Sequence, residues 1–496
     1  MKKIIKSIFK WTLRIVGGLA AALAVWAFVI WLQIPPTEVT PGKDSLASGA
    51  PALPFPKGDI ESYEPHIAVD PNDPNHIVVG AMTGIRFGRG GTDIYRWFTR
   101  DGGKTWSGDF LTPYTGKGVF AADVVMAFDE KGRDHIVTMY GSTPLPQSPV
   151  LIEMVSRLSN LLTFGQNIFH GYPTVREAEE EASNNGQSLA VGDPATGKVS
   201  FPIPLAPKGT IGDKPWIAVD NASDSPFRGS VYAAWTDIGL WDNSNSIHLA
   251  SSRDGGKTVS KSKMVAPLPK SSLVALTTGP AGRVDVAYVH GPDLSIAHVS
   301  SSDGGATFSK PVFITPPYKD RRVIIPVLTT AKDGTVMACW SEVSDTVRLR
   351  INCATKRDNA TPWSRPVGVD QNIAARGIVG LPAVAANDQG LWVAGFRSDK
   401  KTEVVLYRSI DRGATFQEYS ILASRNFGAD SICIDLAGKA QCRVNMLAHN
   451  FNPGDYMGLS ATGNRVAAAF TFPLGNDPVQ FATTYVKIFD VAATTK

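Results

Sequence analysis

The sequence predicts an all-β chain that folds as a single β-propeller with seven blades, and six blades are the alternative. Glycine and proline are frequent, with 46 and 34 residues, and they are scattered along the chain as turns between many short strands require. Apolar strand pairs recur at a spacing of roughly 50–60 residues, and a period of this size is typical of propeller blades. A short turn of nearly constant sequence also appears four times, at 99–107, 251–260, 301–309 and 408–417.

Seven strand pairs follow one pattern, in which an apolar strand and a polar turn precede a second strand rich in Val, Ala and aromatic residues. They begin at His66, Val124, Trp216, Leu273, Pro326, Pro382 and Met457. Because each repeat has room for one blade, we expect the propeller to occupy residues 58–492. Insertions at 143–187 and 424–455 interrupt the spacing, and the first contains an apolar run and a capping box that predict partly helical structure.

The repeated turn has the composition of a tight connection between two strands, as in the segment SDGGATF at 302–308. An aspartate side chain can accept backbone N–H groups from the residues that follow it, and glycine adopts positive φ at little cost. Threonine then returns the chain to the β region, and the aromatic side chain packs under the next sheet. We therefore predict a structural role, and no catalytic one, for the four turn aspartates Asp101, Asp254, Asp303 and Asp411.

The N-terminal part of the chain predicts a membrane anchor followed by a spacer. Residues 1–14 form a basic tip without acidic residues, and residues 15–34 are a stretch of 20 residues without formal charge. Such a stretch can cross a bilayer as a transmembrane helix, and the positive-inside rule then places Met1 in the cytoplasm. A cleaved signal peptide is the alternative, although the segment lacks a small-x-small cleavage site. Residues 35–57 are rich in Pro, Ala, Ser and Gly and predict a semi-rigid linker.

The charge and the cysteine content limit which partners and which cellular compartment can be expected. The formal net charge is +4, but without the five basic residues of the tip the remaining chain carries −1, so no basic face for nucleic acid is expected. The anchor would place the propeller on the periplasmic or extracellular side of the membrane. The four cysteines allow three pairings, of which we favour Cys339–Cys353 and Cys433–Cys442 because each pair is close in sequence; four free thiols are the alternative.

The turns at 101–106, 254–259, 303–308 and 411–416 resemble the Asp box, or BNR repeat, of sialidases and related propellers. The resemblance covers residues 60–490 and includes segments that look like bacterial extracytoplasmic sialidase-like proteins. It implies an exo-glycosidase that acts on acidic glycans. The chain has seven repeats where sialidases usually have six blades, and it lacks the Arg-Ile-Pro motif that precedes their first box. A non-catalytic propeller that binds a glycan or a protein is therefore the alternative.

Ligands of a propeller bind at one end of the central axis, where loops lead into each innermost strand and connect the second strand to the third. In sialidases this funnel holds a tyrosine nucleophile assisted by a glutamate, an acid, and cations that grip the sugar carboxylate. From loop position alone, we expect Tyr456 with Glu342 to supply the nucleophile pair, and Asp123 or Asp213, which precedes Lys214, to supply the acid. We expect substrate contacts from Arg322, Arg376, Arg397, Asp455 and Asp237.

The sequence predicts no cofactor and no metal centre. The eight histidines do not cluster at the spacing of metal ligands, and neither a phosphate-binding loop nor a nucleophile elbow is present. The oxygen-rich segments VDPNDPN and VDNASD could hold a structural calcium ion, but turns between strands are the simpler interpretation.

Overall fold

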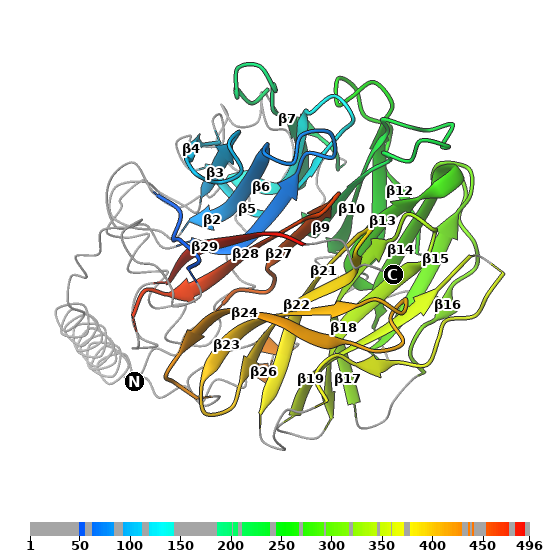
Figure 1. Ribbon diagram of the computed structural model, residues 1–496. Helices are drawn as coiled ribbons and strands as arrows, with labels where there is room; N and C mark the ends of the chain where they lie inside the picture. Colours follow the sequence, from blue (N-terminus) through cyan, green and yellow to red (C-terminus); the bar gives the residue numbers. More distant parts are fainter. Residues whose placement is uncertain are drawn as a thin grey trace, which may run out of the picture.

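The protein is a β-propeller of seven sheets arranged around a central axis, as predicted (Figure 1). Six sheets have four strands and the last blade has three, and neighbouring strands are antiparallel. The structure is a computed structural model, and the residues that it describes are 49–54, 62–83, 93–111, 119–142, 186–200, 202–206, 211–238, 245–266, 271–291, 294–316, 321–344, 348–358, 360–371, 377–428, 435–436, 439–440, 453–475 and 482–491.

The blades follow one another along the chain, and each begins with its innermost strand. Blades 1 to 3 consist of β1 (Ser62–Val69), β2 (Ile77–Thr83), β3 (Asp93–Thr99) and β4 (Ser107–Phe110); β5 (Val119–Phe128), β6 (Asp134–Ser142), β7 (Gly186–Val191) and β8 (Ile203–Pro204); and β9 (Ile211–Val219), β10 (Val231–Ile238), β11 (Ser246–Ser252) and β12 (Lys263–Met264). Blade 4 consists of β13 (Ser272–Gly279), β14 (Arg283–His290), β15 (Ser295–Ser301) and β16 (Val312–Phe313), with the 3-10 helix η1 (Pro280–Gly282) between its first two strands.

Blades 5 to 7 complete the ring. They consist of β17 (Arg321–Thr330), β18 (Val336–Ser344), β19 (Arg348–Lys356) and β20 (Val367–Gly368); β21 (Ile378–Asn387), β22 (Gly390–Ser398), β23 (Thr402–Ser409) and β24 (Gln417–Arg425); and β27 (Gly458–Thr462), β28 (Arg465–Pro473) and β29 (Ala482–Asp490). A small hairpin of β25 (Asp435–Leu436) and β26 (Lys439–Ala440) precedes blade 7. Each innermost strand contacts that of the next blade, and β27 contacts β1.

A segment far from blade 7 in the sequence pairs with its outer strand. Ala52 pairs with Tyr485 of β29, and the backbone N–H of Leu53 donates to the carbonyl of Thr484 at 2.9 Å. Leu53 is fully buried. The first and last parts of the described chain are thereby joined in one sheet, and the propeller begins before residue 58, the boundary expected from the sequence.

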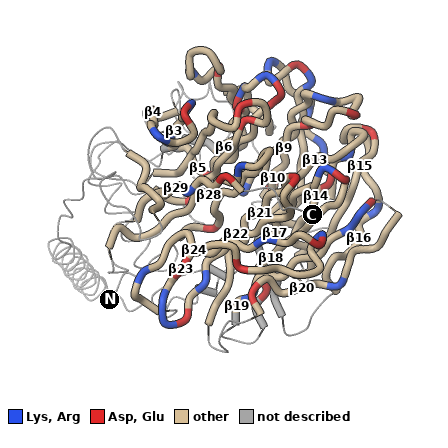
Figure 2. Tube along the Cα trace, in the orientation of Figure 1, with Lys and Arg blue, Asp and Glu red and all other residues tan. Residues whose placement is uncertain are grey.

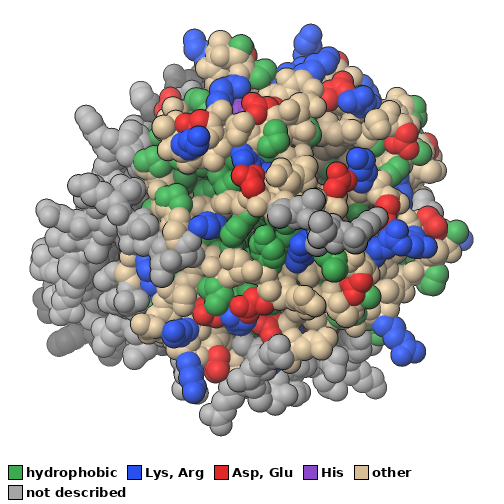
Figure 3. Space-filling model, viewed as in Figure 1, with side chains coloured by type: hydrophobic (Ala, Val, Ile, Leu, Met, Phe, Trp, Pro, Cys, Tyr) green, Lys and Arg blue, Asp and Glu red, His purple; other side chains and the backbone are tan. Residues whose placement is uncertain are grey.

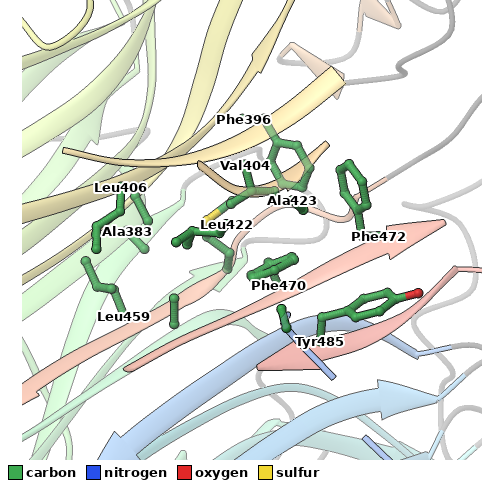
Figure 4. Close-up of a cluster of buried hydrophobic side chains, with 14 of the residues drawn as sticks. Ala383, Phe396, Val404, Leu406, Leu422, Ala423, Leu459, Phe470, Phe472 and Tyr485 are labelled. Carbon is green, nitrogen blue, oxygen red and sulfur yellow. The ribbon is translucent and has the colours of Figure 1, made fainter. Parts of the chain in front are cut away.

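Apolar side chains fill the space between neighbouring blades. Figure 4 shows the cluster between blades 6 and 7, where Phe396 and Val404 of blade 6 lie opposite Phe470 and Tyr485 of blade 7. Similar clusters lie between the other sheets. Because such interfaces are close-packed, they hold the innermost strands at fixed positions around the axis.

The innermost strands share a bulge close to their first residues. The register between the first and second strands shifts there in blades 1 to 6. In five of these blades the bulge residue has a φ between 49° and 56°, and these residues are Glu64, Asp123, Lys214, Leu273 and Leu381. A bulge redirects a side chain and removes a backbone amide from the ladder. The five residues therefore ring one end of the axis.

The four repeated turns connect the third and fourth strands, which places them at the opposite end of the blades from these bulges. In blade 4, Oδ1 of Asp303 accepts the N–H of Thr307 at 2.8 Å, and its Oδ2 accepts the Thr307 hydroxyl at 2.6 Å. The Ser301 hydroxyl donates to the same carboxylate at 2.6 Å. Equivalent threonine bonds recur at Asp101, Asp254 and Asp411. Each carboxylate is thus engaged within its own turn.

Cys339 and Cys353 form a disulfide bond, as predicted, between directly opposed residues of β18 and β19. Cys433 and Cys442 lie outside the described residues, as do the anchor at 15–34 and nearly all of the insertion at 143–187. The second disulfide and the helices expected in those segments therefore stay predictions. In the part of the chain that the structure describes, no helix is long and apolar enough to cross a membrane.

Candidate functional site

The candidate site lies at the end of the axis where the innermost strands begin. Three consecutive blades place the charged residues Glu64, Asp123 and Lys214 at their bulges, and Asp213 directly precedes Lys214. Asp455, on the segment that leads into β27, contacts Lys214. We name these five residues the charged arc. Figure 2 shows acidic and basic positions close together near the centre of the ring.

Lys214 is the centre of the charged arc. Its Nζ lies 2.7 Å from Oδ2 of Asp455, 3.4 Å from Oδ1 of Asp123 and 3.7 Å from Oε2 of Glu64. Its backbone N–H donates to Oδ1 of Asp213 at 3.0 Å and to Oδ2 of Asp123 at 3.3 Å. Burial alone would lower the pKa of Lys214, but the surrounding carboxylates raise this pKa well above its usual value. The lysine is therefore cationic, with four carboxyl groups around it.

These carboxyl groups cannot all be ionised beside a single cation in a buried site. Asp123 and Glu64 are only 4% and 5% exposed, and Asp123 hydrogen-bonds to the carboxyl groups of both Glu64 and Asp213. Burial raises the pKa of Asp213 to about 7, with Lys214 opposing the shift and Asp123 adding to it. Burial also raises the pKa of Glu64 well above its usual value, again against Lys214. At neutral pH the arc therefore retains protons that it can donate.

Tyr456 packs against the charged arc. Its ring centre lies 5.9 Å from Nζ of Lys214, and its hydroxyl donates to the carbonyl of Val124 at 3.3 Å. The side chain is buried, and burial together with the charges of Glu64 and Asp123 raises the pKa of Tyr456 well above its usual value. The hydroxyl therefore stays protonated at neutral pH.

His66 and Trp216 lie beside each other, two residues beyond the bulges of blades 1 and 3. Their ring centroids are 5.7 Å apart with the planes nearly perpendicular. Trp216 packs against clusters of blades 2 and 3, of blades 3 and 4, and of blades 5 and 6, so its side chain reaches across the axis. Nδ1 of His66 accepts the N–H of Met126 at 3.2 Å, and burial lowers the pKa of His66 to about 4. The imidazole is therefore neutral, with its proton on Nε2.

The other side of the ring carries apolar residues at equivalent positions. We name Leu273 of blade 4 and Leu381 of blade 6 the apolar arc. Their backbone N–H groups donate to the hydroxyls of Thr236 and Ser341 on the preceding blades, both at 3.1 Å. The face of the molecule in Figure 3 also has hydrophobic side chains near its centre, with basic and acidic side chains around them. Leu381 is buried in the cluster between blades 6 and 7, whereas Leu273 is partly exposed.

Four residues predicted for the site lie together at this end of the axis: Asp123, Asp213, Asp455 and Tyr456. Glu342, the predicted partner of Tyr456, has a different environment on β18. Its carboxylate accepts the side-chain N–H of Asn352 at 2.8 Å within blade 5. Glu64 is the glutamate that shares the charged arc with Tyr456.

Arg397, predicted to bind a substrate carboxylate, is engaged by carboxylates of the protein itself. Its guanidinium lies 2.6 Å from Glu418, 2.7 Å from Glu403 and 3.2 Å from Asp370. Although burial opposes the shift, Glu418 and Glu403 raise the pKa of Arg397 above its usual value. A guanidinium held by three carboxylates has little remaining capacity to bind an anionic sugar.

The remaining predicted substrate contacts are not brought to the charged arc by the described contacts. Asp237 lies on β10, with its Oδ2 3.7 Å from Nε2 of His248 in the same blade. Arg322 lies on β17, and the structure describes only its backbone. Arg376 lies outside the described residues. Their roles stay predictions.

Sequence reasoning missed Glu64, His66 and Trp216. A signal for the bulge was present, because proline follows the bulge residue in Glu64-Pro65, Lys214-Pro215 and Leu381-Pro382, and a strand proline marks an interrupted ladder. His66 and Trp216 lie in apolar strands, where a local pattern does not distinguish a residue on the axis from one in the core.

The oxygen-rich turns use their carboxylates internally. Oδ1 of Asp70 accepts the N–H of Asn72 at 2.9 Å, and Oδ1 of Asp220 accepts the N–H of Ala222 at 3.1 Å. Among the residues that the structure describes, no group of three metal-binding side chains is found. A structural calcium ion stays an untested alternative.

No family model matches the chain, and no curated protein matches it. Among solved structures, the chain is similar to a protein of unknown function from Dyadobacter fermentans, with 12% identity, a TM-score of 0.43, and coverage of 90% of this chain and 99% of that chain. It is also similar to an ulvan lyase, with 11% identity, a TM-score of 0.48, and coverage of 87% of this chain and 94% of that chain. The NanB sialidase from Streptococcus pneumoniae is similar as well, with 14% identity, a TM-score of 0.41, and coverage of 93% of this chain and 72% of that chain. Likeness at this level concerns the fold alone, so the function is argued from the site.

Proposed function

We propose that the charged arc is an acid–base site and that the protein is a glycan-acting propeller, a glycoside hydrolase in which Asp213 is the proton donor. The observation that carries this proposal is the Asp213–Asp123 carboxyl pair beside Lys214, because burial raises the pKa of Asp213 to about 7. A general acid is most effective when its pKa lies near the working pH, and strongly shifted groups cluster at functional sites.

Tyr456 and Glu64 supply the nucleophile pair in this proposal. The Tyr456 oxygen attacks the anomeric carbon, its proton passes to Glu64, and the proton of Asp213 goes to the leaving oxygen as the glycosidic bond breaks. Water then attacks the anomeric carbon and breaks the glycosyl–tyrosine bond, while Asp213 accepts a proton of the water and Glu64 returns its proton to the Tyr456 oxygen. Glu64 must be ionised to accept the tyrosine proton, and because burial raises its pKa well above the usual value, only the fraction of the protein with ionised Glu64 can react.

The charge of the arc favours an uncharged sugar at the reacting position over the acidic sugar expected from the sequence. Lys214 is the cation of the arc, and four carboxyl groups already surround it. Arg397, a predicted carboxylate ligand, is engaged by three acidic residues. An anionic sugar would therefore meet like charges, whereas a neutral sugar avoids this repulsion and its leaving oxygen can accept the proton of Asp213.

The test is hydrolysis of a panel of aryl and alkyl glycosides, neutral and sialylated, by the wild type and by Asp213→Asn. The variant should lose about 10²–10⁴-fold in kcat on alkyl glycosides, and less on nitrophenyl glycosides, whose leaving group needs little protonation. Ser272→Ala, at the equivalent position in blade 4, is the matched control and should retain activity. Wild-type kcat in Asp213→Asn would contradict the proposal, and turnover of sialosides alone would overturn the neutral substrate.

A second candidate is a propeller that binds a glycan or protein without turnover. The observation that favours it is that the arc is internally satisfied: Lys214 is paired, and the Tyr456 hydroxyl donates to a backbone carbonyl. A glycan-binding array with the wild type separates the two candidates. A binding propeller would retain a glycan without cleaving it, and Tyr456→Phe would change only the affinity.

We also propose that the propeller lies outside the cytoplasm and is tethered through residues 15–34. The disulfide Cys339–Cys353 supports an oxidising compartment, and the uncharged stretch supports a membrane anchor. Residues 35–48, between that stretch and the segment that pairs with β29, can extend at most about 50 Å. Protease added outside intact cells should digest the propeller, and a soluble, protected propeller would contradict the tether.

A further inference from the structure

A cleft of about 190 Å³ lies between blades 2 and 3 at the end of the propeller that carries the repeated turns. It is formed by the turn between β5 and β6, the turn between β9 and β10, and the repeated turn of blade 3. Its basic lining residues are Lys131, Arg133, Arg228, Arg253 and Lys257. Its acidic lining residues are Asp129, Glu130 and Asp254.

Two of the three acidic residues form ion pairs with basic residues of the cleft, and the third, Asp254, is hydrogen-bonded within its own turn but keeps its charge. Oδ2 of Asp129 lies 2.7 Å from Arg133 and 2.9 Å from Nε2 of His135. Glu130 lies 2.6 Å from Arg228. The Asp254 carboxylate accepts the N–H groups and the threonine hydroxyl of its own turn, which hold the pKa of Asp254 well below its usual value. Five basic and three acidic lining residues therefore leave the cleft with an excess of two positive charges.

Three basic side chains of the cleft form no ion pair among the described residues. Lys131 and Lys257 are exposed, and their ammonium groups have no ion pair or hydrogen bond among the described residues. The Arg253 guanidinium is held in place, with one nitrogen donating to the Ser230 hydroxyl at 2.7 Å and another to the Gly304 carbonyl at 2.7 Å. It also stacks on Phe227, 4.6 Å from the ring centre. The cleft thus combines one fixed cation with two free ones.

We propose that this cleft binds one oxyanion group, a sulfate or phosphate ester carried by a glycan. Its volume is below the roughly 300–1,000 Å³ of pockets that enclose drug-sized ligands, so it fits a single charged group and not a whole sugar chain. Lysine and arginine together suit a tetrahedral oxyanion, which accepts several charge-assisted hydrogen bonds. No exposed large hydrophobic residue lies in the described lining of the cleft, which favours a soluble glycan over a lipid surface.

The chain offers a matched control for this site. Lys257 occupies the fourth position of the repeated turn in blade 3, and Lys104 occupies the same position in blade 1, also exposed, without lining the cleft. Lys257→Gln, Lys131→Gln and Lys104→Gln each remove one surface charge, so thermal melts should be unchanged for all three. Calorimetric titration at low salt uses inorganic phosphate, inorganic sulfate and a sulfated oligosaccharide as probes.

We expect Lys257→Gln and Lys131→Gln each to weaken binding of the sulfated oligosaccharide about fivefold, and to lower the salt dependence of its Kd, while Lys104→Gln changes neither. Asp213→Asn should bind the probe normally, which separates this site from the proposed function. Equal losses in the Lys104 and Lys257 variants would overturn the site in favour of diffuse surface charge. Binding to vesicles of anionic phospholipid without binding of the oligosaccharide would overturn the glycan as ligand.

Discussion

The charged arc and the apolar arc are built on the same backbone. Lys214 in one and Leu273 in the other both occupy a bulge near the start of an innermost strand, with φ values of 49° and 53°. A non-glycine residue at positive φ costs on the order of 1–3 kcal/mol, and such strain often accompanies a functional site. Here the strain occurs on both sides of the ring, so it belongs to the blade and does not mark the site.

The difference between the arcs lies in what satisfies the bulge amide. In the apolar arc, the N–H of Leu273 and the N–H of Leu381 each donate to a neutral hydroxyl. In the charged arc, the N–H of Lys214 donates to carboxylates of Asp123 and Asp213. The same structural requirement thus brings neutral acceptors to one side and titratable groups to the other, and only the second side can transfer protons.

Lys214→Met should have the largest effect on stability. It leaves four carboxyl groups without their cation, of which those of Glu64 and Asp123 are buried, and removing one partner of a buried ion pair costs about 3–5 kcal/mol. Leu273→Met, which introduces the same residue at the equivalent bulge of the apolar arc, should cost less than about 1.5 kcal/mol. Urea unfolding at pH 7 measures both. The loss in Lys214→Met should shrink at acid pH as the carboxyl groups take up protons; equal, pH-independent losses would remove the distinction between the arcs.

Loss of the Cys339–Cys353 disulfide should destabilise blade 5, which lies between the two blades of the apolar arc, while leaving the charged arc intact. The bond spans 14 residues, and a loop of this size contributes about 3 kcal/mol. Replacing both cysteines by alanine should lower the urea midpoint by that amount without changing the pH dependence of any activity. Peptide mapping of the wild-type protein without reduction tests the predicted Cys433–Cys442 bond; four free thiols in wild-type protein from an oxidising compartment would contradict both bonds.

The smallest effects separate a turn aspartate from a residue of the site. Asp303→Ala removes an acceptor of the Thr307 amide and should cost about 1–3 kcal/mol, with activity of the folded fraction unchanged. Tyr456→Phe removes one hydrogen bond to Val124 and should cost about 1 kcal/mol, but it should abolish turnover if Tyr456 is the nucleophile. Thermal melts and glycosidase assays on both variants decide this. Normal folding of Asp303→Ala with lost turnover would reverse the two assignments.

Much of the fold could be predicted from the sequence because propeller signals are local. Each blade repeats its own strand and turn pattern, and the topology alone places Asp123, Asp213 and Tyr456 at the start of innermost strands. The contact between Glu64 and the segment of Asp455 depends instead on ring closure, since the two residues are 391 positions apart. No local pattern indicates such a neighbour, and for the same reason the pairing of Ala52 with β29 was not predicted.

The most direct test of the account is the titration of the Asp213 carboxyl group by carbon NMR, with Asp213→Asn to assign the signal. In the folded protein the pKa is raised to about 7, above the value of about 3.9 in an unfolded chain. Asp213 therefore contributes stability below about pH 4 that is lost as the pH rises through 7, and the Asn variant should lack this slope. A midpoint near 7 supports a proton-donating charged arc, whereas a midpoint near 4 would contradict it.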